Sequence, residues 1–87
     1  MTSKASPRFW ACLNALPPSV QALAKSKYDI WRRDPFHPSL HFKELAPGLW
    51  SARINLQYRA LARRRGELVA WFWIGTHEEY DRLIPRG

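Results

Sequence analysis

Three side chains in the second half of the sequence, Arg53, Arg59 and His77, are suited to chemistry on a phosphate. Arginine keeps its charge and grips phosphate oxygens through parallel N–H groups, and the imidazole of histidine gains and loses a proton near neutral pH. Cleavage of RNA needs a group that removes the ribose 2′-hydroxyl proton, cations that stabilise the phosphorane and an acid for the leaving 5′-oxygen. We therefore interpret these three residues as a candidate catalytic set.

Three further residues could hold the substrate of such a reaction. His41 and Lys43 lie in a segment where polar and apolar residues alternate, and Tyr80 follows shortly after His77. Basic side chains attract a phosphate backbone, and a tyrosine ring can stack on an unpaired base. We predict His41, Lys43 and Tyr80 as substrate-binding residues.

Each candidate also has a simpler interpretation. The two arginines could be solvated or paired with Glu44 or Asp81, since surface ion pairs are common and weak. The histidine follows Thr76, a good N-cap, and could be no more than the first residue of a helix. The tyrosine could pack in the core, as could Trp50. The residue types alone leave these alternatives open.

The sequence does not contain the ligand spacing of a metal site. His37, His41 and His77 are its only histidines, and Cys12 is its only cysteine. Pro38 prevents His37 and His41 from sharing a helical face. A glycine-rich phosphate loop and a Ser-His-Asp order are also missing from the sequence. We therefore predict that the protein uses neither a metal nor a cofactor.

The charge of the chain predicts an anionic partner. Lysine and arginine total 14 against 7 acidic residues, which leaves a formal net charge of +7, and ten of the cations are arginine. Solubility alone needs less charge, so RNA, DNA, an anionic membrane surface or an acidic protein segment is the expected partner. A single cysteine excludes an internal disulfide, and no apolar run approaches the roughly 20 residues of a membrane span. We expect a cytoplasmic protein that does not enter a membrane.

The first half of the chain predicts two helices. Its 87 residues suffice for one domain, and the 46% hydrophobic content favours a folded core over disorder. Phe9, Leu13 and Leu16 have helical spacing over residues 7–16, and a second apolar stripe runs over residues 18–33 to Trp31. Pro17 separates the two helices, and residues 34–39 are expected to form a loop.

From residue 40 the apolar period changes to two, which predicts strands at 40–45, 50–57, 58–62 and 68–74. Leu56 is expected to face inward, residues 63–67 to form a hairpin tip, and Thr76 with Glu79 to cap a short helix at 77–84. A tight connection between two antiparallel strands would make Arg53 and Arg59 neighbours on the sheet. The expected fold is α+β, with an N-terminal helical hairpin packed on a twisted antiparallel sheet of about four strands and a short C-terminal helix.

Four segments, residues 37–43, 49–53, 57–61 and 71–80, contain a Trp-Ser-x-Arg strand, a Tyr-Arg pair and an Ile-Gly-x-His end. Together they resemble the RelE/ParE toxin superfamily of bacterial type II toxin–antitoxin modules. The resemblance covers one domain at residues 7–84 and implies a cognate acidic antitoxin that wraps it. This superfamily usually begins with a strand, whereas residues 1–6 of this sequence are expected to form a flexible N-terminus.

The resemblance implies different activities for different branches of the superfamily. In the RelE-like branch it implies cleavage of mRNA on the ribosome by a metal-independent, RNase-like mechanism, with site roles for Arg53, Arg59 and His77 and, less directly, for Lys43 and Tyr80. The ParE-like branch shares the fold but inhibits DNA gyrase without cleaving RNA, and an inactive relative would only bind RNA or protein. We expect an mRNA endoribonuclease, because a pure gyrase inhibitor needs no set of cations and a base.

Overall fold

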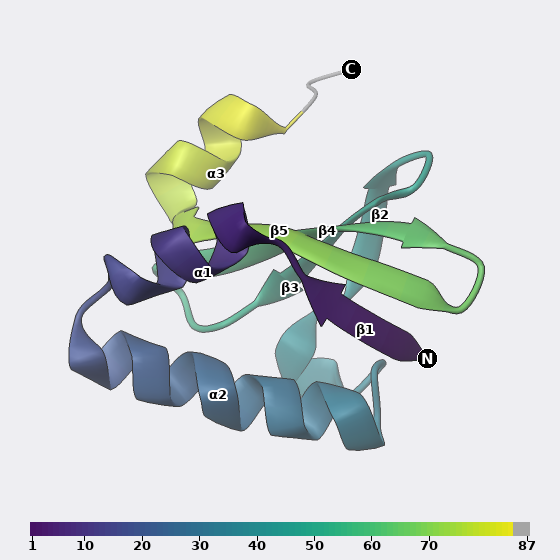
Figure 1. Cartoon of the computed structure of the whole chain (residues 1–87), viewed down its shortest axis with the longest axis horizontal. Helices are drawn as coiled ribbons and strands as arrows, with labels where there is room; N and C mark the ends of the chain where they lie inside the picture. The colour runs from purple at the N-terminus through teal and green to yellow at the C-terminus, as the bar shows by residue number, and fades with distance from the viewer. Residues whose placement is uncertain (85–87) are drawn as a thin grey trace.

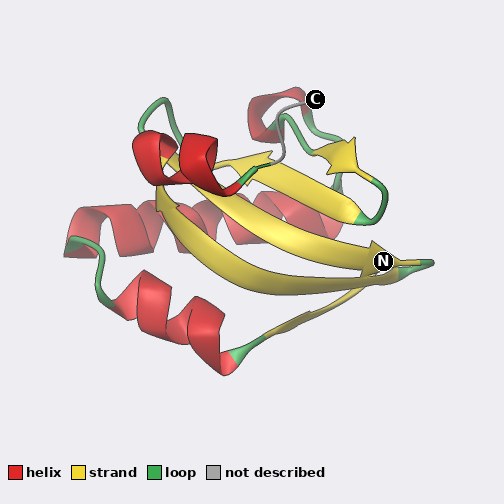
Figure 2. Cartoon of the chain, turned by 90° about the horizontal axis from the view of Figure 1, so that it is seen from above, coloured by secondary structure: helices red, strands yellow, loops and turns green. Residues whose placement is uncertain are grey.

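The computed structural model describes residues 1–84 and has the expected α+β architecture. Five strands form one sheet in the order β1-β5-β4-β3-β2, in which β1 is parallel to β5 and the other pairs are antiparallel. Figure 1 shows α2 along one side of the sheet and α3 on the other side, and Figure 2 shows the strong twist of the strands. The strands are β1 (Thr2–Ala5), β2 (Lys43–Ala46), β3 (Leu49–Arg53), β4 (Tyr58–Arg65) and β5 (Leu68–Thr76), and the helices are α1 (Pro7–Asn14), α2 (Pro18–Arg33) and α3 (His77–Leu83).

Strand β1 corrects the expectation of a flexible N-terminus and of about four strands. Thr2 pairs with Leu68 and Ala5 with Trp71, and the backbone N–H of Ser6 donates to the carbonyl of Trp71 at 2.9 Å. This short polar segment has little hydrophobic pattern of its own, so hydrogen bonds to β5 supply most of its order. The chain therefore does begin with the strand that the superfamily pattern calls for.

The two N-terminal helices follow the sequence prediction closely. Helix α1 begins after Ser6, whose hydroxyl accepts the N–H of Phe9 at 3.2 Å, and ends at Asn14 rather than at residue 16. Helix α2 has the predicted bounds and buries Val20, Ala24 and Trp31. Within residues 1–84, no helix combines the length and the apolar character needed to cross a bilayer.

The predicted strand at 40–45 begins later than expected. Residues Pro38–Leu40 form a turn of 3-10 helix, and His41 has a φ of 44°, in the left-handed region. Nδ1 of His37 accepts the N–H of Ser39 and stabilises this turn locally. Leu40 and Phe42 are buried as predicted, although they precede β2 instead of belonging to it.

Two further boundaries differ from the prediction. Strand β3 ends at Arg53 because the side-chain oxygen of Asn55 accepts the N–H groups of Gln57 and Tyr58 and turns the chain. Leu56 lies on this turn and is 73% exposed, so its predicted inward orientation is wrong. Residues 63–65 belong to β4 instead of a hairpin tip, and the turn is made by Gly66, with a φ of 59°, and Glu67.

The core lies on both faces of the sheet. On the α2 face, Trp31 packs against apolar residues of β3, β4 and β5, including Ala52, Ala60 and Trp71. On the α3 face, Tyr80 packs in a smaller cluster with Leu49, Leu61 and Trp73. Since successive residues of a strand alternate between faces, Arg53 and Arg59 emerge on the α3 face.

Candidate functional site

The antiparallel pairing of β3 and β4 places Arg53 directly opposite Arg59. On its other side Arg59 is opposite Gly75 of β5, two residues before His77. Strand pairing therefore brings together the two arginines and the start of α3, which are separated in the sequence. The expectation that Arg53 and Arg59 are neighbours on the sheet is confirmed.

Arg59 is half-buried and lies beside a second positive charge. Its guanidinium donates to the backbone carbonyls of Asn55 and Tyr58, the latter at 3.0 Å. Burial first, and then the positive charge of Arg53, lower the pKa of Arg59, while Tyr80 and Asp81 act in the opposite direction. Arginine nevertheless stays protonated in proteins, so this site holds two adjacent cations whose repulsion an anion would relieve.

His41 joins the site through its ring. An N–H group of Arg53 donates to Nε2 of His41 at 3.1 Å. The left-handed backbone of His41, which follows the 3-10 turn, directs the exposed ring toward β3. This contact orients the Arg53 guanidinium without neutralising its charge.

His77 is the first residue of α3. A capping box between Thr76 and Glu79 starts this helix as predicted, and the backbone N–H of His77 donates to the carbonyl of Gln57 at 2.7 Å. Nδ1 of the ring lies 3.0 Å from a carboxylate oxygen of Asp81, one helical turn later, and both side chains are partly exposed. The carboxylate holds the ring through Nδ1 and leaves Nε2 available for a proton.

Of the two remaining candidates, Tyr80 is buried and Lys43 is exposed. Tyr80 is buried, its ring centroid lies 5.7 Å from that of His77, and its hydroxyl lies 3.4 Å from the hydroxyl of Ser51, which is itself buried. Tyr80 therefore forms part of the floor beneath the arginines instead of offering a stacking surface. Lys43 is exposed on β2 and lies opposite Ser51 in the strand register, two residues along β3 from Arg53.

A model of one protein family matches most of this chain: the ParE-like toxin domain, over residues 18–82. The chain belongs to this ParE-like toxin family. This family agrees with the RelE/ParE resemblance of its sequence motifs. No curated protein sequence matches it.

Solved structures of other toxins share the fold of this ParE-like domain. The RelB–RelE complex from Methanococcus jannaschii matches with a TM-score of 0.72 at 13% identity, covering 91% of this chain and 96% of that one. The RelBE2 toxin–antitoxin complex from Mycobacterium tuberculosis matches with a TM-score of 0.67 at 24% identity, covering 87% and 96%. The isolated RelE toxin from E. coli matches with a TM-score of 0.64 at 16% identity, covering 93% and 92%. Two of these three relatives were crystallised with their antitoxins.

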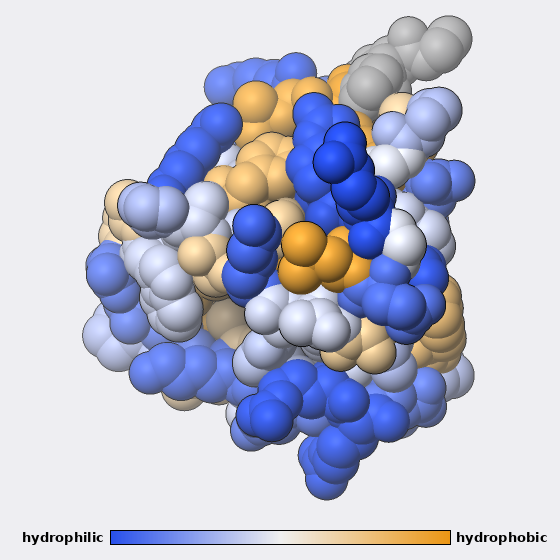
Figure 3. All heavy atoms as spheres, turned by 45° about the vertical axis from the view of Figure 1, so that its right-hand side comes forward, coloured by the Kyte–Doolittle hydropathy of each residue, from blue (hydrophilic) through white to orange (hydrophobic). Residues whose placement is uncertain are grey.

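The basic surface of the ParE-like domain extends along β4 beyond the arginine pair. Arg63 lies on the same face as Arg59, with its guanidinium 5.5 Å from the ring centroid of Phe72. Figure 3 shows the side of the molecule that carries the turn between β4 and β5, where hydrophilic side chains lie beside apolar areas. Among residues 1–84, no cluster of three or more His, Cys, Asp or Glu side chains has the arrangement of a metal site.

Sequence reasoning missed several residues that shape this site of the toxin domain. The sequence suggests Asp81 only as a partner for an arginine, whereas it contacts His77, and the i to i+4 spacing on a helix is the signal for this contact. Asn55 anchors the turn that positions Arg59, and an Asn between two strands is typical of such a turn. The burial of Ser51 beneath Tyr80 has no signal in the local sequence.

Proposed function

We propose that this toxin cleaves mRNA bound to the ribosome, without a metal, at the face that carries Arg53, Arg59 and His77. The observation that supports this most directly is the adjacent arginine pair, in which burial and repulsion lower the pKa of Arg59. A phosphate bound between the two guanidinium groups would replace repulsion by two sets of charge-assisted hydrogen bonds. The doubly charged phosphorane would gain more from them than the ground-state phosphodiester does.

In this proposal each residue has a separate role. Arg53 and Arg59 stabilise the negative charge that develops on the phosphate oxygens. His77, held through Nδ1 by Asp81, exchanges a proton at Nε2 with the 2′-hydroxyl or the 5′-oxygen. Lys43 and His41 hold neighbouring phosphates, and Tyr80 supports the site from below.

Mapping of mRNA 5′ ends after expression of the toxin tests this proposal. New ends should appear within coding regions, and Arg59→Gln should reduce them by at least about 100-fold. Arg64→Gln is the matched control, because Arg64 is on the same strand but packs over Trp50 on the α2 face, at 4.8 Å. Growth arrest without new ends would refute cleavage of mRNA.

Inhibition of DNA gyrase is the second candidate function, and the match to the ParE-like family favours it. A gyrase inhibitor would bind its target through the same fold without proton transfer. It should abolish supercoiling by purified gyrase, and His77→Ala should leave this effect intact. A lack of any growth effect together with salt-dependent RNA binding would instead indicate an inactive RNA-binding relative.

A cognate antitoxin with an acidic segment is the proposed partner of either toxin. Related toxins were crystallised with antitoxins, and the net charge of +7 favours an acidic segment on this face. A partner at 100 times its Kd should stabilise the toxin by about 2.7 kcal/mol through mass action. A melting temperature that stays constant at saturating antitoxin would contradict this pairing.

A further inference from the structure

The α2 face of the sheet contains a cavity of about 560 Å³ that the proposed RNA site does not use. It lies between α1, α2, β1 and the sheet, and a volume of this size is typical of small-molecule pockets. The sheet separates it from Arg53 and Arg59, which are on the opposite face. Its walls are mostly apolar and include Phe9, Leu13, Ala24, Ile54, Ala60 and Ile74.

Two tryptophan rings belong to the lining of this cavity. Trp31 and Trp71 both line it, are 2% and 6% exposed, and have ring centroids 5.5 Å apart. Neither indole Nε1–H has a hydrogen-bond partner among residues 1–84. Both Nε1 atoms are covered by the surrounding protein, so the two rings contribute apolar surface to the lining.

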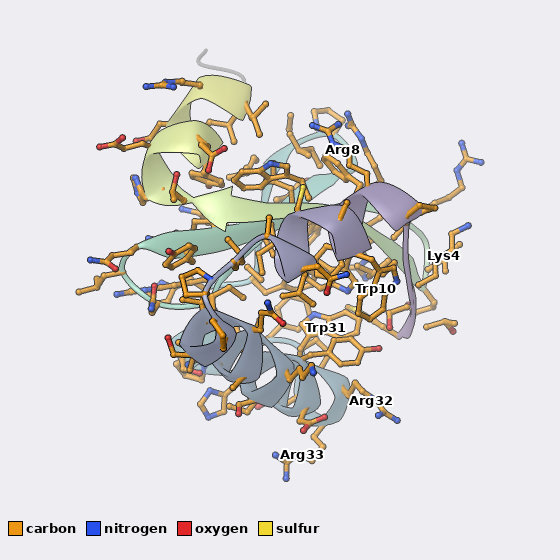
Figure 4. The ribbon with its side chains drawn as sticks, turned by 60° about the vertical axis from the view of Figure 1, so that its left-hand side comes forward. Lys4, Arg8, Trp10, Trp31, Arg32 and Arg33 are labelled. Atoms are coloured by element: carbon orange, nitrogen blue, oxygen red, sulfur yellow. The ribbon has the colours of Figure 1, made fainter. Side chains whose placement is uncertain are left out.

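Positive charge surrounds the opening of the cavity. Lys4, Lys25, Lys27 and Arg32 are among its lining residues, against the single carboxylate of Asp29. Figure 4 shows Trp10 and Trp31 between α1 and α2, with Lys4 on β1 and Arg32 on α2 on either side of them. The opening therefore favours an anionic group on a ligand whose body lies among the apolar walls.

We propose that this cavity binds a small amphipathic carboxylate, with an apolar body among the walls, which include the rings of Trp31 and Trp71, and a carboxylate at the basic opening. The apolar walls remove the body of the ligand from water, and the basic side chains attract its carboxylate. A hydrogen bond of 2.5 Å between the hydroxyl groups of Ser3 and Tyr28 joins β1 to α2 beside this opening.

A ligand series tests each part of this proposal on the unmodified protein. The probe is phenylbenzoylpropanoate, which combines an apolar biphenyl group with a carboxylate. The chain has five tryptophans, whose indole N–H signals can be followed separately by NMR. Titration should move the signals of Trp31 and Trp71 and leave that of Trp73, on the other face of the sheet, in place. An unchanged pair of signals would overturn the proposal.

Two analogues separate the contributions of the apolar body and the carboxylate. Replacing the biphenyl group by a single phenyl group should weaken binding by at least about tenfold, because apolar surface is removed from the walls. The methyl ester of the probe should bind at least about threefold more weakly, with the difference lost at high salt. Equal affinity of the phenyl analogue would overturn the role of the apolar walls, and equal affinity of the ester would overturn that of the basic opening.

A substitution that fills the cavity provides an independent test. Ala24→Leu adds bulk at a lining position and should weaken the probe by at least about tenfold. Ala22→Leu is the matched control, because Ala22 is on the exposed face of the same helix and should not affect binding. Undiminished binding to a folded Ala24→Leu variant would overturn this location of the site. RNA cleavage is not part of any of these measurements, so their outcome is independent of the proposed function.

Discussion

Substitution of Gly75 by alanine should destabilise the toxin domain through one steric conflict. A Cβ atom at this position would lie 2.9 Å from Cη2 and 3.1 Å from Cε2 of Trp73, and closer still to Cζ2. The ring of Trp73 is buried among Leu49, Leu61 and Tyr80, which limits its movement. Glycine is therefore needed in the Ile-Gly-x-His segment because the indole lies across the backbone.

The size of the effect follows from two opposing terms. Alanine is favoured over glycine within a strand by about 0.5–1 kcal/mol, since it loses less backbone entropy on folding. Overpacking of a filled core costs about 1–3 kcal/mol, and the short distances to the ring place this conflict at the upper end. We expect a net loss of about 2 kcal/mol, or a melting temperature lower by roughly 8–16 °C for a domain of this size.

A double-mutant cycle with Trp73→Phe identifies the cause. The smaller ring removes the benzo atoms that a Cβ would meet, at a cost of about 1–2 kcal/mol for the space that it leaves. Adding Gly75→Ala to Trp73→Phe should then cost little, so the coupling energy should be about 2 kcal/mol. Urea denaturation of the four proteins measures it.

Gly66→Ala is the matched control for this cycle. Gly66 has a φ of 59°, and a Cβ atom added there would meet no described atom within 4 Å, so alanine should cost only about 1 kcal/mol of backbone strain. This cost should be the same with and without Trp73→Phe. Additive effects of Gly75→Ala and Trp73→Phe would refute the steric explanation.

Three further predictions concern the elements that build the site. Thr76→Ala should remove the capping box of α3 and lower stability by about 1 kcal/mol in thermal denaturation, whereas an unchanged melting temperature would contradict the capping role. The lowered folded-state pKa of Arg59 means that its protonated form destabilises the fold. This loss of stability is constant at every pH below that pKa, including neutral pH, and becomes smaller only when the pH rises above it in strongly alkaline solution. Arg53→Gln should therefore raise stability by about 0.5 kcal/mol in low salt and by nothing measurable in about 1 M salt, and a gain that is independent of salt would exclude charge repulsion. Deletion of residues 2–5 should expose the edge of β5 and speed amide hydrogen exchange along it, and unaltered protection of β5 would show that β1 is dispensable.

Features specified by neighbouring residues were predictable. Helix α2 was predicted with correct bounds because its prolines and apolar stripe act within a few residues of each other. The capping box of Thr76 and Glu79 and the glycine turn at Gly66 are local in the same sense. The alternating pattern of β3 predicted that Arg53 lies on a polar face. It did not predict how far Arg53 lies from any other cation.

Features that depend on distant hydrogen bonds were not predictable in the same way. Strand β1 has four residues and obtains its order from β5, more than 60 positions later in the chain. Leu56 continues an alternating pattern, but the side chain of Asn55 turns the backbone and exposes it. The spacing of apolar residues does not reveal such a turn, because the hydrogen bonds of one polar side chain can end a strand whose apolar alternation continues.

The sequence by itself determined the α+β class, the helices, the residue types of the basic face and the motifs of a RelE/ParE toxin. Those properties follow from local periodicity, capping and composition. Only the tertiary structure decided that Arg53 lies opposite Arg59, that Asp81 holds His77, and that Trp31 and Trp71 line a cavity on the α2 face. Strand register and packing bring these groups together across long stretches of chain, and neither quantity is encoded in any short segment.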